Sequence, residues 1–131
     1  MSATRGLENW HRVLAGGSTP AALAEIIRDD AVFHSPVVHT PQEGRAKVVG
    51  YLAAAGVVLN TDAFRYVREF SDGNHALLEF VTELDGIQIN GVDIITFDEA
   101  GLIADFKVMV RPLKAINKVW EMMGAQLARQ G

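Results

Sequence analysis

Three short turn sequences divide the second half of the chain into four β-prone runs. The turns occupy residues 71–74, 85–86 and 98–101, and each combines glycine with aspartate, a composition typical of tight turns. The runs cover residues 64–70, 75–84, 87–97 and 102–110. Strands joined by such short connections pair with their neighbours in antiparallel fashion. We therefore expect a four-stranded antiparallel meander.

The first half of the chain has mainly helical periodicity. Apolar residues recur at helical spacing in residues 7–14 and again in residues 20–27, where Pro20 falls in the first turn. A β-prone run at residues 31–38 precedes a third helix, which residues 44–47 open and whose apolar side extends to residue 59. Pro112 starts a C-terminal helix with one apolar face. The order of elements predicts a single α+β domain over residues 1–131, with helices packed on one face of the meander.

The composition excludes several classes of function. The sequence has no cysteine, so disulfides and thiolate chemistry are ruled out. The net charge is −4 and the 12 Lys and Arg residues are scattered, which argues against a nucleic-acid partner. No apolar run is long enough to span a bilayer and residues 1–8 lack the core of a signal peptide, so we expect a cytoplasmic protein without membrane contacts.

Metal and cofactor sites also lack support in the sequence. The four histidines show no spacing typical of metal ligands. Gly16 and Gly17 stand between two helices and lack the preceding strand that a nucleotide-binding glycine loop requires. We expect neither a metal nor a cofactor.

Three segments carry a resemblance to a known superfamily. Residues 29–36 read DDAVFHSP, residues 92–103 read VDIITFDEAGLI, and residues 111–113 close the last strand with RPL. With the order of elements, they resemble the SnoaL-like branch of the nuclear transport factor 2-like superfamily, which includes ketosteroid isomerases, polyketide cyclases and limonene epoxide hydrolases. The resemblance implies a strongly curved antiparallel sheet wrapped around three N-terminal helices, a conical pocket for a small apolar molecule, and a homodimer formed through the sheet face.

Ketosteroid isomerase gives the sharpest comparison, because its chemistry needs three side chains. The position of its carboxylate base corresponds to Ser35, which cannot take a proton from carbon at neutral pH. The tyrosine that donates to the oxyanion falls near Trp10, whose ring nitrogen can also donate. The protonated aspartic acid corresponds to Asp93, which stands among Val, Ile and Ile. The resemblance thus implies Asp93 as the acid and hydrogen-bond donor, without the base.

Asp93 and His34 each have more than one interpretation. Asp93 is either a ligand-binding acid kept neutral by burial, or a carboxylate bonded to the backbone near Asn90 and Gly91. His34, beside the missing base, is a candidate base because histidine titrates near neutrality. Strand alternation, however, places His34 on the face opposite Ser35.

Further residues are candidates for the pocket wall. Phe80, Phe106 and Val108 alternate toward one face of their strands, and Tyr51 on the third predicted helix can reach the pocket mouth. The alternative is an ordinary packed core, which uses the same residue types.

Two glutamates on one strand face form another candidate pair. Glu79 and Glu83 are either paired carboxylates for acid–base chemistry or ion-pair partners of Arg65 or Lys107.

Three functions remain open at this point. The first is binding of a small apolar molecule that carries a carbonyl or hydroxyl, held by shape and by Asp93. The second is an isomerase or cyclase of steroid-, polyketide- or terpenoid-like substrates that stabilises an oxyanion through Asp93 and Trp10. The third is a dimeric interaction protein whose interior is filled.

Overall fold

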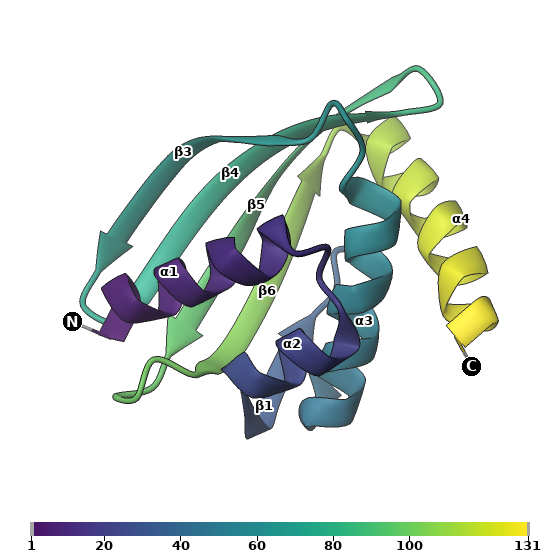
Figure 1. Ribbon diagram of the computed structural model, residues 1–131. Helices are drawn as coiled ribbons and strands as arrows, with labels where there is room; N and C mark the ends of the chain where they lie inside the picture. The colour runs from purple at the N-terminus through teal and green to yellow at the C-terminus, as the bar shows by residue number, and fades with distance from the viewer. Residues whose placement is uncertain (1, 131) are drawn as a thin grey trace.

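The computed structural model describes residues 2–130, which form four helices and six strands (Figure 1). The helices are α1 (Ser2–Ala15), α2 (Pro20–Ile26), α3 (Arg45–Leu59) and α4 (Leu113–Gln130). The strands are β1 (Ile27–His34), β2 (Gln42–Glu43), β3 (Arg65–Asp72), β4 (His75–Leu84), β5 (Ile87–Phe97) and β6 (Ile103–Arg111).

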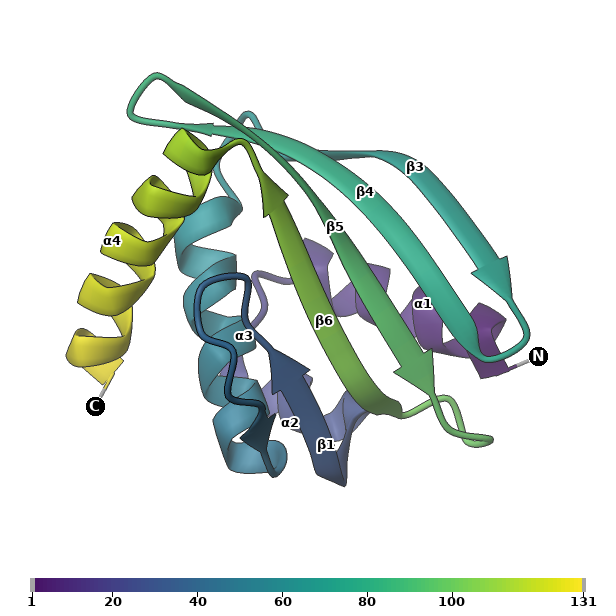
Figure 2. The ribbon, with the colours of Figure 1, turned by 180° about the vertical axis from the view of Figure 1, so that it is seen from behind.

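The six strands form one curved, unclosed sheet in the order β2-β1-β6-β5-β4-β3. Strands β3 to β6 make the expected antiparallel meander. The early strand β1 joins the meander beside β6 and runs parallel to it (Figure 2). The predicted α+β fold is confirmed, and the sheet is mixed rather than antiparallel throughout, because turn sequences reveal only the pairing of consecutive strands.

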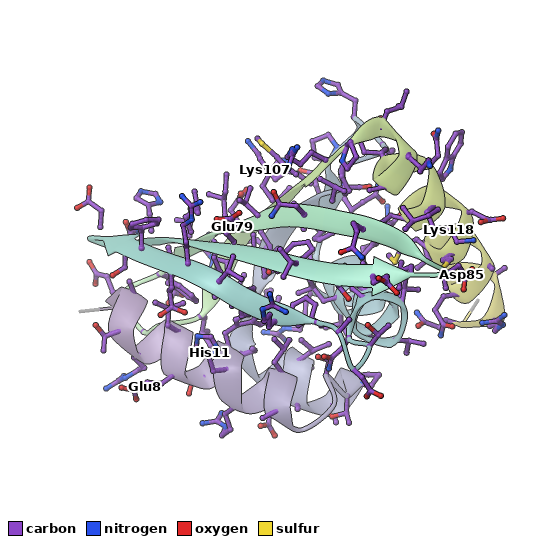
Figure 3. All side chains as sticks on the ribbon, turned by 90° about the horizontal axis from the view of Figure 1, so that it is seen from above. Glu8, His11, Glu79, Asp85, Lys107 and Lys118 are labelled. Carbon is purple, nitrogen blue, oxygen red and sulfur yellow. The ribbon has the colours of Figure 1, made fainter. Side chains whose placement is uncertain are left out.

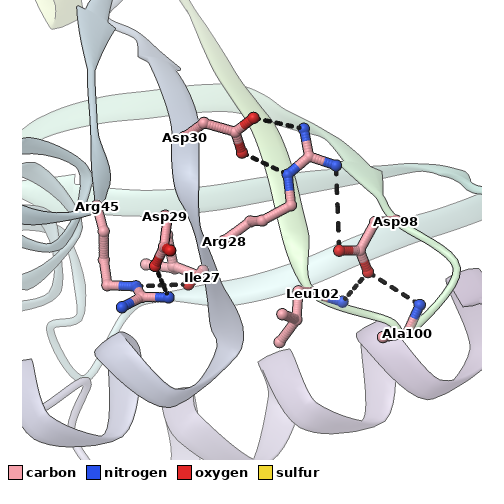
Figure 4. Close-up of polar contacts among 8 residues, drawn as sticks. All are labelled: Ile27, Arg28, Asp29, Asp30, Arg45, Asp98, Ala100 and Leu102. Carbon is pink, nitrogen blue, oxygen red and sulfur yellow. Dashed lines mark hydrogen bonds and ion pairs between the residues drawn. The ribbon is translucent and has the colours of Figure 1, made fainter.

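Strand β1 begins earlier than its sequence predicts. The expected strand starts at residue 31, but the structure places Asp29 and Asp30 inside β1 as well. Two arginines hold these exposed carboxylates (Figure 4). Arg28 pairs with Asp30, while Arg45 pairs with Asp29 and donates to the carbonyl of Ile27 at 2.8 Å. Neighbouring cations thus allow two adjacent acids in a strand, a position that propensity disfavours.

The core lies between the concave face of the sheet and helices α1 to α3 (Figures 1 and 2). In β4 and β5 every second side chain is buried on this face. Helix α4 packs beside α3, and Lys118 ties it to the β4–β5 turn through a 2.7 Å ion pair with Asp85 (Figure 3). None of the helices within residues 2–130 has the length and apolar character needed to cross a lipid bilayer.

Candidate functional site

An inner cavity of about 50 Å³ lies between the concave face of the sheet and helices α1 and α3. Its wall is apolar apart from a few polar side chains, so a ligand here would meet hydrocarbon over most of its surface. It is lined by Trp10, Leu14, Ser18, Leu52, Ala55, Gly56, Leu59, Asn60, Phe64, Tyr66, Phe80, Asp93, Phe106 and Val108.

Three of these side chains form a hydrogen-bonded chain across α1, β3 and β5. The ring nitrogen of Trp10 donates to the hydroxyl of Tyr66 at 3.0 Å. That hydroxyl in turn donates to Asp93 Oδ2 at 2.6 Å. The chain fixes the direction of the Tyr66 hydrogen, because the tyrosine oxygen already accepts from Trp10.

Burial sets the protonation of this group. Desolvation raises the pKa of Asp93 from 3.8 to about 7, and the hydrogen bond from Tyr66 opposes the rise. Burial, together with the neighbouring charge of Asp93, raises the pKa of Tyr66 well above its ordinary value. Asp93 therefore changes protonation close to neutral pH, as a proton donor or acceptor at pH 7 must.

An outer cavity of about 130 Å³ adjoins the inner one. Ala55, Leu59 and Val108 line both cavities and separate them. The outer cavity extends from this partition to helix α4 and is almost wholly apolar. Its wall further comprises Phe33, Ser35, Pro36, Val37, Val38, Tyr51, Val110, Val119, Trp120, Met123, Gly124 and Leu127. The interior is thus hollow at two points.

The comparisons with known proteins agree with this geometry. The sequence profile described as a SnoaL-like domain matches residues 7–106. The chain belongs to the SnoaL-like domain family. This match supports the predicted membership of the nuclear transport factor 2-like superfamily. No curated protein matches the sequence.

Several solved structures share the fold of this SnoaL-like chain. A steroid delta-isomerase from Pseudomonas aeruginosa is 35% identical, with a TM-score of 0.91 over 98% of this chain and 93% of that one. An uncharacterized protein with a cystatin-like fold from Silicibacter pomeroyi is 30% identical, with a TM-score of 0.84 over 92% and 84%. An NTF2-like protein of unknown function from Mesorhizobium loti is 21% identical, with a TM-score of 0.71 over 86% and 95%, and shows the fold alone.

The structure brings most of the predicted pocket residues of this SnoaL-like domain to the two cavities. Trp10, Phe80, Asp93 and Phe106 line the inner cavity, and Val108 lines both. The alternative interpretation of Asp93 does not hold, since its carboxylate bonds to a side chain, Tyr66, rather than to backbone near Asn90.

Trp10 and Tyr51 differ in detail from their expected positions. The ring N–H of Trp10 donates its hydrogen bond to Tyr66, so it is not free to bond another acceptor. Tyr51 lines the outer cavity, where its ring stacks on Phe33 with centroids 5.2 Å apart.

Ser35 and His34 do not reach Asp93. Ser35 lines only the outer cavity of the two, and its hydroxyl accepts a hydrogen bond from the N–H of Val37 at 3.1 Å. His34 lines neither cavity; its Nε2 lies 2.8 Å from Asp105 on the other side of the strand. The role of His34 as a base is therefore corrected: strand alternation directs its ring away from the interior, as it directs Asp105.

Glu79 and Glu83 have separate polar partners on the other face of the sheet. Glu79 pairs with Arg68 at 2.8 Å, rather than with Arg65 or Lys107, and Glu83 bonds to Gln88. Figure 3 shows Glu79 and Lys107 on the side of the sheet away from α1. The two glutamates are thus not a catalytic pair in the cavity.

Sequence reasoning missed Tyr66 and Ser18. Tyr66 stands two residues after Phe64, and both line the inner cavity. The spacing of two places both side chains on one face of β3 and could have indicated Tyr66. A register shift between Tyr66 and Arg68, however, interrupts the alternation of side chains in the rest of the strand. Ser18 has no periodic signal, because it lies in the turn between α1 and α2.

Proposed function

We propose that this protein binds a small apolar carbonyl compound whose oxygen is held by Asp93. One observation carries the proposal: a buried carboxyl, already paired with Tyr66, stands in the wall of an otherwise apolar cavity. The fold and its isomerase-like neighbours are compatible with an isomerase or a cyclase.

Protonated Asp93 is suited to hold a carbonyl. Its Oδ2 accepts from Tyr66, so the carboxylic hydrogen is free for a ligand oxygen. Below its pKa of about 7 the neutral acid donates this hydrogen bond, whereas the carboxylate above that pKa repels a carbonyl oxygen. The expected ligand oxygen is therefore an acceptor.

The cavity sizes define how such a ligand fits. A cavity of about 150 Å³ is known to admit benzene, and the inner cavity measures about 50 Å³. It has room for the polar head of a ligand only. The apolar remainder would extend past Leu59 and Val108 into the outer cavity beside α4.

Calorimetric titration with a neutral ketone, 4-androsten-3-one, tests this proposal. Because only the protonated fraction of Asp93 binds, affinity should fall about tenfold or more between pH 6 and pH 8.5. Asp93→Asn, which keeps an N–H donor, should make the affinity independent of pH, and Asp93→Ala should weaken it at pH 6. Asp62→Asn, at an exposed position, is the matched control. Equal affinity of wild type and Asp93→Ala would refute the proposal.

A second candidate function is isomerisation of a double bond next to the carbonyl. Two observations favour it: the pKa of Asp93 near 7 and the 35% identity to a steroid delta-isomerase. Ionised Asp93 would take a proton from the carbon beside the carbonyl, leaving the electron pair on the carbonyl oxygen as an enolate. Once Asp93 carries that proton it no longer needs the hydrogen of Tyr66, which can then donate to the enolate oxygen. Asp93 would return the proton to the far carbon.

The two candidates have opposite pH signatures. Turnover of 5-androstene-3,17-dione, followed by the absorbance of the conjugated enone, should rise with pH and level off above about pH 7, where Asp93 is ionised. Asp93→Asn should lower kcat at least a hundredfold, the usual contribution of a general base. Absence of turnover would exclude the isomerase and leave the binding proposal standing, whereas full turnover in Asp93→Asn would exclude Asp93 as the base of the reaction.

A further inference from the structure

Ser18 is a buried polar residue without a hydrogen-bond partner. Its exposed fraction is 4%, and its hydroxyl oxygen is the one buried side-chain polar atom within the described residues that has no partner. The same residue lines the inner cavity with Asp93 and Tyr66. Buried hydroxyls nearly always find a partner, so an unpaired one beside a cavity points to a missing ligand atom.

The local backbone holds this hydroxyl in place. Ser18 has a left-handed backbone (φ 53°), and its N–H donates to the carbonyl of Val13 at 3.0 Å. Its side chain faces Gly56 of α3 so closely that a Cβ at residue 56 would lie 2.8 Å from Ser18 Cβ and 3.2 Å from Ser18 Oγ. Because residue 56 is a glycine, Ser18 in the turn between α1 and α2 can pack against α3 at the cavity wall.

We propose that Ser18 is a second polar anchor of the inner cavity, which selects ligands whose head carries two oxygen functions. This inference rests on the proposed function, since it takes the inner cavity as the site of the ligand head. Asp93 reaches the cavity from the sheet, and Ser18 reaches it from the turn between two helices. One oxygen of the ligand would bond to Asp93 and the other to Ser18.

The size of the cavity limits the distance between these oxygens. About 50 Å³ accommodates one short head, so both oxygens must belong to the same three-carbon unit. A 1,3-dicarbonyl or a 3-hydroxy ketone meets this requirement, followed by an apolar tail for the outer cavity. A serine hydroxyl both donates and accepts, so the second oxygen can be a carbonyl or a hydroxyl.

Two ketones with the same chain length test the role of Ser18. 2-Nonanone carries one carbonyl, and 2,4-nonanedione carries two in the 1,3 relation. Their affinities are measured by calorimetry at pH 6 for wild type, Ser18→Ala and Ser18→Gly. The glycine variant tolerates the left-handed backbone and guards against a folding defect. Ser71→Ala, an exposed serine on β3, is the matched control.

We expect the diketone to bind the wild type about tenfold more tightly than the monoketone, the factor typical of one added hydrogen bond. Both Ser18 variants should abolish this advantage by weakening the binding of the diketone alone. Their thermal midpoints without ligand should not fall, because the hydroxyl makes no bond in the empty protein.

Other outcomes overturn the inference in recognisable ways. Equal affinities of the two probes for wild type, or an advantage that persists in Ser18→Ala, would remove Ser18 as an anchor while leaving the cavity as a site. Equal loss of both probes with a lower thermal midpoint would assign Ser18 a structural role. If neither probe binds any variant, the proposed function fails for this ligand class and the anchor fails with it.

Discussion

At the scale of single residues, the protonation of Asp93 has a consequence for stability. The folded protein keeps a proton on Asp93 up to a pKa of about 7, whereas the unfolded chain releases it near 3.8. Between these values the folded state binds more protons, so Asp93 makes stability fall as pH rises, by up to about 1.4 kcal/mol per pH unit, and the fall ends above about pH 7.

Asp93→Asn should remove this component. Urea unfolding at pH 5 and pH 8 measures it, since the other titrating groups are common to both proteins. We expect the wild type to lose more stability between the two pH values than the variant loses. Parallel pH profiles would show that Asp93 is not buried as a neutral acid.

Tyr66 is the residue that connects Trp10 to Asp93. Tyr66→Phe leaves the Trp10 N–H and the Asp93 carboxyl without their partner, and unpaired buried groups cost about 1–3 kcal/mol each. The variant should also raise the pKa of Asp93 further, because the Tyr66 hydrogen bond lowers it. Carboxyl carbon NMR titration checks the pKa, with Tyr51→Phe as control; an unchanged Asp93 titration would contradict this assignment.

Some residues of the candidate site could be predicted from the sequence, and others could not. Asp93 could be predicted because it stands alone among apolar strand residues, and Trp10 could be predicted because helical spacing buries it. Ser35 and His34 belong to a different matched segment, residues 29–36, yet neither residue lines the inner cavity. Ser18 was not predictable, since its burial depends on a glycine 38 positions along the chain.

At the scale of elements, the meander and all four helices were predictable from turn residues and periodicity. The partner of β1 was not, because a parallel pair with a strand some 70 residues later has no local signal. The two-residue strand β2, which pairs antiparallel with β1, was not predictable either, because two residues are too few to show an alternating pattern.

The close packing of α1 against the sheet depends on Gly6. A Cβ at Gly6 would lie 2.3 Å from the ring of Phe97 in β5, whereas one at Gly50 in α3 has nothing within 4 Å. Gly6→Ala should therefore destabilise the fold by about 1–3 kcal/mol through overpacking. It should also displace Trp10, which α1 carries, and weaken ligand binding.

Gly50→Ala is the matched helical control. It should stabilise the protein by about 0.5–1 kcal/mol, the difference in helix propensity. Thermal unfolding of both variants measures the contrast. A neutral Gly6→Ala would mean that α1 can shift on the sheet without loss, and that its contact with Phe97 does not position the site.

At the scale of the whole molecule, the outer face of the sheet carries several apolar side chains. They belong to the positions that alternate with the buried ones in β4, β5 and β6. Across the strands, Leu77 pairs with Ile94, and Val92 with Met109. Met109 is 51% exposed. Asp93 lies between Val92 and Ile94, so β5 presents its acid to the cavity and its apolar neighbours to the outer face.

We propose that this outer face pairs two copies of the chain, because its partly exposed apolar side chains would be covered when two such faces meet. Sedimentation equilibrium should then give twice the mass of one chain. Met109→Glu places a charge at the centre of the face without touching the core and should weaken the dimer at least tenfold. Val57→Glu, at a 63% exposed apolar position on α3, should leave it intact.

A monomeric wild type, or a dimer equally sensitive to both changes, would assign the outer face no role in self-association. Dissociation by Met109→Glu with unchanged ketone binding would further show that each copy holds a complete site, as expected if alternate side chains of β5 serve the two faces independently.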